Sequence, residues 1–265
     1  MHGETAQPHT QQQAGQTDVA SHFTADAHAL GLAVALGDGL GHQPLHVIGL
    51  GDVADHAVRG QPIRTQPGRR RLRQFLLDIA RSANDASILV REAWDKYESP
   101  IDYGIAGLDL PKVAALIDAG LPTSLYYVAY RNNAFDTHVF QNDLHQRLLT
   151  YTSDAVSGFM QDLERIGRAD DVVVMIFSEF GRRVPENVSL GTDHGAANVM
   201  FVVGNNVKGG HYGEIPSLTA LTEGDNLVYT TDFRRVYQTM MQGWLGQRDT
   251  AGILNGDFGS FEMFV

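Results

Sequence analysis

Residues 176–204 read IFSEFGRRVPENVSLGTDHGAANVMFVVG, two apolar runs on either side of a polar loop. The first run continues an apolar segment that begins after Asp171, and the second ends at Gly204. Short runs of this kind, rich in Val and Ile and bounded by turn residues, are typical of buried strands. The loop contains carboxylates, arginines, glycines and a single histidine. We therefore expect two buried strands joined by a loop that carries chemically active groups.

Helical and strand patterns alternate along the chain from residue 75 onward. Apolar residues recur at intervals of three and four in 75–97 and again in 144–163, which predicts two amphipathic helices. Residues 108–122, LDLPKVAALIDAGLP, have the start and stop signals of a shorter helix, and 124–130, SLYYVAY, read as a buried strand. This alternation is typical of an α/β fold with a mainly parallel sheet flanked by helices. We expect residues 75–265 to form that domain.

The first 74 residues have a different composition. The chain has 12 Phe, 9 Tyr and 2 Trp, and of these 23 aromatics only Phe23 precedes residue 74. A segment with so few large apolar side chains has little from which to build a core. We expect residues 1–74 to be an atypical N-terminal segment, poorly ordered over about the first 40 residues, with one short strand in PLHVIGLGDV at 44–53.

Charge and composition exclude several classes of protein. The formal net charge of −11 over 265 residues argues against nucleic acid or an anionic membrane as the main partner. We interpret the basic run RTQPGRRRLR at 64–73 as a solvated face. The absence of cysteine excludes disulfides and thiolate chemistry. The chain as written has no apolar run long enough to span a bilayer and no signal peptide at its start, which predicts a cytoplasmic location.

Candidate metal ligands follow the predicted strands. Asp136 and His138 come after the strand at 124–130, and Glu179 directly follows the strand that ends near Phe177. Ligands of open α/β sheets bind beyond the carboxyl ends of strands, and Asp193-His194 would close such a site from the adjacent loop. Carboxylate oxygens and imidazole nitrogens bind zinc, manganese or iron. The alternative is structural, because Asp-Thr-His can form a turn or cap and Glu179 can pair with Arg182.

Other polar groups have weaker claims to a role. Arg182, Asn187 and Lys208 are candidate ligands for an anion such as phosphate or sulfate, and a loop turn is the competing interpretation for Lys208. Three hydroxyl groups lie near the candidate ligands in sequence, those of Thr137, Ser178 and Thr192. Each is as well suited to capping a turn as to attacking an ester, so no nucleophile is assigned.

Several segments in order carry a resemblance to a known family. They are ALIDAGLPTSLYYVAY, FDTHVFQ, SEFGRR, GTDHG, VKGGHYGEIPSL and TTDFRRVYQTMMQGWLG, spanning residues 86–246 with their surroundings. They resemble the bacterial family called domain of unknown function 1501, which is placed with sulfatase-like and alkaline-phosphatase-like proteins. The resemblance implies a divalent-metal site in which Asp136, His138, Glu179, Asp193 and His194 are the ligands.

The resemblance also implies an activity and a location. Relatives in the alkaline phosphatase superfamily use two metal ions to hydrolyse phosphate or sulfate esters, so a small ester or oxyanion is the expected substrate. Full-length members begin with a twin-arginine export signal and a first strand containing Gly-Gly-Asp, and neither is visible here. We therefore expect a fold shortened at its N-terminus. The alternatives are a non-catalytic metal- or ligand-binding member and a truncated inactive product, and the sequence leaves metal identity and oligomeric state open.

Overall fold

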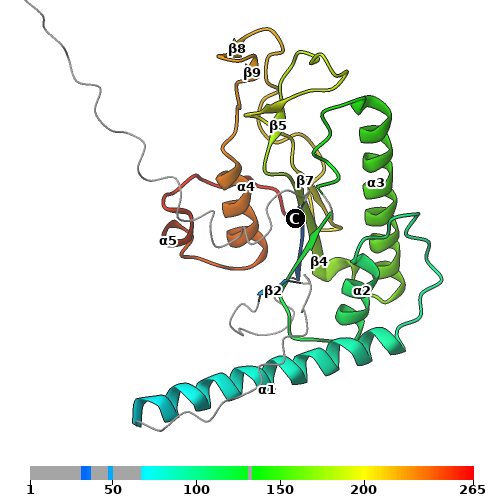
Figure 1. Ribbon diagram of the computed structural model, residues 1–265, viewed down its shortest axis with the longest axis vertical. Coiled ribbons are helices and arrows are strands. Elements are labelled where there is room, and N and C mark those ends of the chain that lie inside the picture. Colours follow the sequence, from blue (N-terminus) through cyan, green and yellow to red (C-terminus); the bar gives the residue numbers. More distant parts are fainter. Residues whose placement is uncertain (1–30, 37–46, 50–66, 131–132) are drawn as a thin grey trace, which may run out of the picture.

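A mixed five-stranded sheet forms the centre of the protein. The computed structural model describes residues 31–36, 47–49, 67–130 and 133–265 (Figure 1). The strands lie in the order β2 (Val47–Gly49), β3 (Leu125–Ala129), β1 (Gly31–Leu36), β4 (Val172–Phe177) and β7 (Phe201–Val203). Strands β3, β4 and β7 coincide with the three apolar runs expected from the sequence. The short strand expected within 44–53 is β2.

The prediction of a mainly parallel sheet is wrong. Among the described strands, β2 and β3 alone pair in parallel, whereas β1 runs antiparallel to both β3 and β4, and β7 runs antiparallel to β4. Strands β3 and β4 still point in the same direction, as strands joined by a helical crossover do. The reason for the error is β1, which occupies the position between them. Its pairing joins Gly31 to Ala129 on one side and to Phe177 on the other.

Strand β1 comes from the part of the chain that we interpreted as poorly ordered. Its sequence GLAVAL has no aromatic residue but is a short apolar run, which suits a central strand paired on both sides. The rest of residues 1–40 lies outside the described residues. Helix α1 (Pro67–Lys96) runs across residue 74, where the composition changes. The domain boundary itself stays a prediction.

Helical layers cover both faces of the sheet. On β4, Val172 and Val174 pack into one core with α2 (Leu110–Asp118) and α3 (Gln141–Arg165). Val173 and Met175, which alternate with them, face a second core on the other side. That core includes residues of α4 (Phe233–Thr239) and of the π-helical segment η3 (Met240–Trp244), and the short helix α5 (Ala251–Leu254) lies on the same side (Figure 1). A strand buried on both faces explains why β4 is uniformly apolar.

The segment between β4 and α4 is built mostly of loops and extends beyond one end of the sheet (Figure 1). Apart from β7, its regular structure consists of two small hairpins. One pairs β5 (Gly181–Arg182) with β6 (His194–Gly195), and the other pairs β8 (Leu221–Thr222) with β9 (Asn226–Leu227). The first hairpin lies within the polar loop that joins β4 to β7.

The buried carboxylate of Asp162 anchors the segment that follows α1 to helix α3. Asp162 on α3 has no exposed surface, and it accepts hydrogen bonds from the hydroxyls of Tyr103 at 2.6 Å, Tyr97 at 2.7 Å and Ser99 at 2.8 Å. Arg165 Nε donates a fourth, at 2.7 Å. Burial alone would raise the pKa of Asp162, but the four donors outweigh it and hold that pKa below its usual value.

Candidate metal centre

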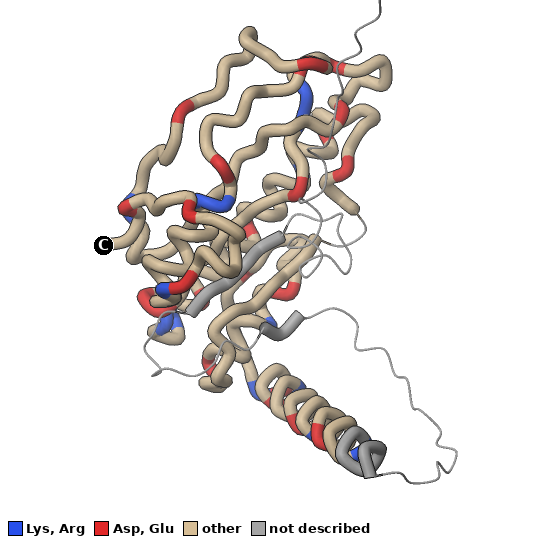
Figure 2. Tube along the Cα trace, turned by 90° about the vertical axis from the view of Figure 1, so that its left-hand side faces the viewer, with Lys and Arg blue, Asp and Glu red and all other residues tan. Residues whose placement is uncertain are grey.

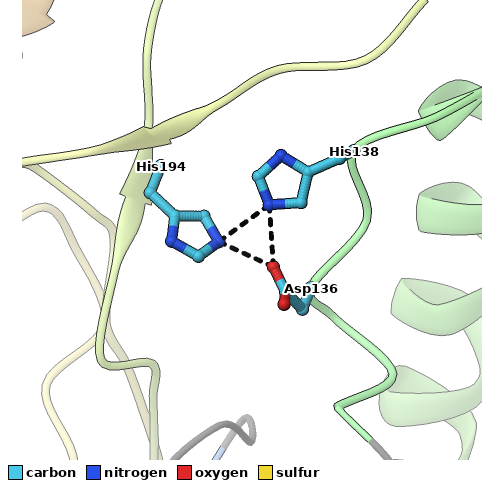
Figure 3. Close-up of side chains that lie close together, drawn as sticks. All are labelled: Asp136, His138 and His194. Carbon is cyan, nitrogen blue, oxygen red and sulfur yellow. Dashed lines mark hydrogen bonds and ion pairs between the residues drawn. The ribbon is translucent and has the colours of Figure 1, made fainter. Parts of the chain in front are cut away.

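Two loops meet beyond the sheet because β3 and β4 point the same way. The loop after β3 carries Asp136 and His138 into α3, and the hairpin after β4 carries His194 on β6. Figure 3 shows the three side chains pointing toward one another from these two segments. The expected convergence is therefore confirmed for these three residues. This convergence requires β3 and β4 to point in the same direction, but it does not require them to be neighbours in the sheet.

The three donor atoms lie within 3.0 Å of one another. His194 Nε2 is 2.6 Å from Asp136 Oδ1, and His138 Nε2 is 2.9 Å from the same oxygen. The two Nε2 atoms are 3.0 Å apart. Ligands around a tetrahedral zinc ion would be about 3.3 Å apart, given metal–nitrogen bonds of about 2.0–2.1 Å. A small outward movement of each side chain would therefore accommodate an ion.

Asp193 contacts the far side of one imidazole. Its Oδ1 is 3.5 Å from His138 Nδ1, and it also accepts a hydrogen bond from Asn187 Nδ2 at 3.1 Å. A carboxylate at Nδ1 favours the tautomer that leaves a lone pair on Nε2. That lone pair then faces the Asp136 oxygen and His194. Such a cluster needs a proton or a cation at its centre, because its lone pairs would otherwise repel one another.

The loop of residues 187–191 is bonded to the start of α3. Phe140 N and Gln141 N donate to the carbonyls of Ser189 and Leu190, each at 3.0 Å, which satisfies amides that a helix start leaves free. Asn187 Nδ2 also donates to His138 O at 3.2 Å. Gly191 packs against the backbone of His138 so closely that a Cβ would overlap it. These contacts fix the His138 loop relative to the segment that leads to His194.

Arg182 joins the two loops that carry the cluster. It pairs with His194 across the β5–β6 hairpin. Its guanidinium donates to Thr192 O and to Phe135 O, both at 2.7 Å. Burial lowers the pKa of Arg182, with the carboxylates of Asp136 and Asp193 opposing that shift. A longer hydrogen bond goes to Thr137 Oγ1 at 3.4 Å. All three acceptors belong to the two loops, so Arg182 positions the site, and its direct contact with an anion stays a prediction.

The three candidate hydroxyls all take part in structural hydrogen bonds. Thr137 is buried, and its oxygen lies 3.0 Å from Gln141 Nε2 and 3.2 Å from His145 Nδ1. Thr192 Oγ1 donates to Gln141 Oε1 at 2.8 Å, and Ser178 Oγ donates to Phe180 O at 3.2 Å. Burial, followed by the charge of Arg182, lowers the pKa of His145, which favours a neutral ring next to Thr137. These contacts suit support of the loops better than attack on an ester.

Two supporting residues were not among the candidates drawn from the sequence. Phe180 stacks on the His194 ring with centroids 3.8 Å apart and planes 15° apart, which fixes the orientation of that imidazole. Gln141 bridges Thr137 and Thr192 and so links the two loops. Phe180 lies in the motif SEFGRR and Gln141 in the motif FDTHVFQ. Membership of these motifs could have identified both residues, whereas their residue types alone did not suggest a role at a metal site.

Two further candidates lie apart from the cluster. Glu179 is exposed on the bend after β4, and its charge adds to burial in raising the pKa of Tyr127 on β3. Among the described residues, the group that could hold a metal does not include it. Lys208 follows β7, which runs antiparallel to β4, and the neighbouring Asn205 bonds to Asp170 before β4. Lys208 therefore lies toward the opposite end of the sheet, and its anion-binding role stays a prediction.

Replacing Arg182 by lysine is expected to lower the free energy of unfolding by about 1–3 kcal/mol. An ammonium group cannot match the planar fork that holds two carbonyls, and one of them would lose its partner. Urea denaturation would measure the change. The adjacent and exposed Arg183→Lys provides a matched control and should be neutral. Equal stability of the two variants would contradict the bridging role.

The fold and the cluster define a mixed α/β protein with a candidate His-His-Asp metal centre. Residues 123–242 match the model of a family described as protein of unknown function (DUF1501), which supports the resemblance found in the sequence. The match covers 120 of the 265 residues and includes all three members of the cluster. Comparisons with curated proteins and with solved structures gave no match.

Proposed function

We propose that Asp136, His138 and His194 bind one divalent cation, and that the bound centre hydrolyses a phosphate or sulfate ester. The observation that supports the metal site is the convergence of one carboxylate oxygen and two imidazole nitrogens within 3.0 Å. Two nitrogens with one oxygen suit zinc, and manganese is the nearest alternative. Asp193 holds His138 with Nε2 toward the ion.

The exposure of the cluster favours chemistry over a purely structural site. The side chains of Asp136, His138 and His194 are 30%, 36% and 43% exposed, so one side of the centre is open to solvent. Structural zinc sites are closed by four protein ligands, whereas catalytic sites keep three and leave a position for water or substrate. A bound cation would polarise an ester oxygen and activate water for attack, so a protein hydroxyl need not be the nucleophile. The ester class is taken from the family resemblance.

A non-catalytic metal-binding protein is the second candidate. The hydrogen bonds of Thr137, Ser178 and Thr192 support it in one respect, because they leave none of these hydroxyls as a free nucleophile and make hydrolysis depend on metal-bound water alone. In that case the same three residues bind the ion and nothing is turned over. A truncated inactive product would fail to bind metal tightly at all.

Calorimetric titration of chelator-treated protein with zinc or manganese tests the site. We expect about one ion per chain and loss of binding in Asp136→Ala. Asp143→Ala, an exposed carboxylate in the first turn of α3, is the matched control and should bind normally. Glu179→Ala reports whether that residue joins the site once an ion enters. Unchanged binding by Asp136→Ala would rule out the proposed centre.

Hydrolysis of 4-nitrophenyl phosphate and 4-nitrophenyl sulfate separates the two candidates. Turnover that requires added metal and disappears in Asp136→Ala supports the hydrolase. Tight metal binding without turnover of either ester supports the binding protein.

A further inference from the structure

Helix α1 carries a continuous apolar stripe that the described part of its own domain covers only at one end. Its main members, each three or four residues after the last, are Leu76, Ile79, Ala83, Ala86, Val90 and Ala93. Phe75 widens the stripe at its start, and Tyr97 continues it just beyond the helix. At the C-terminal end, Ala93 is buried and Val90 and Tyr97 pack against the core that holds α2 and α3. At the other end, Phe75, Leu76 and Ile79 are 61%, 55% and 50% exposed.

The exposed part of the stripe lies where α1 extends away from the rest of the protein. Figures 1 and 2 both show the helix reaching beyond the sheet and its covering helices. Residues 73–89 span about 25 Å at 1.5 Å per residue. Helices of this length are marginal in water unless an apolar face is packed. The stripe that joins α1 to its own domain therefore continues into an apolar surface that is exposed in the described part of the protein. No helix in the described part of the chain, α1 included, has the length and apolar character to cross a membrane.

The sizes of the side chains indicate which partner fits. Large residues, Phe75, Leu76 and Ile79, occupy the first half of the exposed stripe, whereas Ala83 and Ala86 occupy the second. Two such helices in antiparallel orientation set the large residues of one against the alanines of the other. This is the alternation that close packing favours. A parallel pair would set large against large and leave a gap between the alanines.

The charges favour the same orientation. Residues 67–81 contain five arginines and one aspartate, a net charge of +4, whereas residues 82–98 contain four acidic and two basic residues, a net charge of −2. Antiparallel helices place the basic half of one beside the acidic half of the other. Parallel helices would place the two basic halves together, which is unfavourable.

We propose that two copies of this chain form a dimer through residues 73–89 of α1, packed antiparallel about a point near residue 81. Ile79 of each copy then faces Ala83 of the other, and Leu76 faces Ala86. In this dimer, the apolar stripe that packs α1 against its own domain continues directly into the dimer interface. This dimer does not depend on the metal centre.

Sedimentation velocity over a range of concentrations tests the association. We expect a dimer whose dissociation constant rises at least about tenfold in Ile79→Glu. Leu77→Glu is the matched control, because Leu77 is an exposed leucine on the opposite side of the same helix and should leave the dimer intact. Circular dichroism checks that both variants keep their helix content. A monomer at every concentration would overturn the proposal, and hydrogen-exchange protection of residues 73–89 in that monomer would show that another segment covers the stripe.

Cross-linking tests the orientation. The chain contains no cysteine, so only introduced thiols can react. Oxidation of a mixture of Leu76→Cys and Ala86→Cys chains should give the mixed disulfide. Leu76→Cys alone should remain unlinked, because its two copies would be about 15 Å apart along the seam, beyond disulfide reach. Efficient 76–76 linkage would instead show a parallel pair and overturn the antiparallel dimer.

Discussion

Replacing Asp162 by alanine is expected to lower the free energy of unfolding by about 3–5 kcal/mol. The carboxylate has no exposed surface and accepts four hydrogen bonds. Its removal leaves three hydroxyls and the partly exposed Arg165 guanidinium without their common acceptor. Each buried donor that loses its partner costs about 1–3 kcal/mol, and several are lost together here. Urea denaturation would measure the loss. The segment 97–103 should open first, because these hydrogen bonds fasten it to α3.

A matched control for this prediction is Glu164→Ala, which removes an exposed carboxylate from the same helix and should change stability by less than about 0.5 kcal/mol. Tyr103→Phe removes a single donor and should cost about 1–2 kcal/mol, which keeps the test informative if Asp162→Ala fails to fold. A loss for Asp162→Ala no larger than that for Glu164→Ala would contradict the anchoring role.

The same network predicts acid sensitivity. The folded pKa of Asp162 lies below its unfolded value, so its contribution to stability is complete above the unfolded pKa, about 3.9, and is lost as the pH falls through the folded pKa. The wild-type protein should therefore lose stability more steeply below about pH 4 than Asp162→Asn. Parallel pH profiles for the two would show that the network does not depend on ionisation.

The sequence predicted the local elements of the fold better than their arrangement. Strands β3 and β4 and helices α2 and α3 follow from runs and periods that each segment carries by itself. The place of β1 does not, because GLAVAL pairs with residues about 100 and 140 positions away and no local pattern encodes those partners. The residues around it include few aromatics, so composition predicted little structure there although GLAVAL is itself an apolar run.

The candidate site was predictable to the extent that strand ends determine it. Asp136 and His138 follow β3, and the hairpin bearing His194 follows β4, so the common direction of two strands was sufficient. Glu179 shows the limit of this rule, because its position after β4 does not determine where its side chain points. Arg182 shows another, because charge alone does not tell whether a guanidinium meets an anion or the carbonyls of neighbouring loops.

Replacing His194 by alanine is expected to weaken zinc or manganese binding by more than about 100-fold. The substitution removes one of the three donor atoms, and the two that remain, 2.9 Å apart, lie on a single loop. Asp193→Ala should weaken binding by only about 10–100-fold, because Asp193 orients His138 without contributing a donor to the cluster. Calorimetric titration of chelator-treated protein would give both affinities.

The order of these two losses distinguishes a ligand from an orienting residue. His211→Ala is the matched control for His194→Ala, since His211 is an exposed histidine in a loop, outside the cluster, and its removal should leave the affinity unchanged. Phe180→Leu should produce an intermediate loss, because the stacked ring orients His194 but donates nothing to the ion. If Asp193→Ala weakened binding more than His194→Ala, Asp193 would be the ligand and His194 its support. The loop between β4 and β7 would then bind the ion through a carboxylate instead of an imidazole.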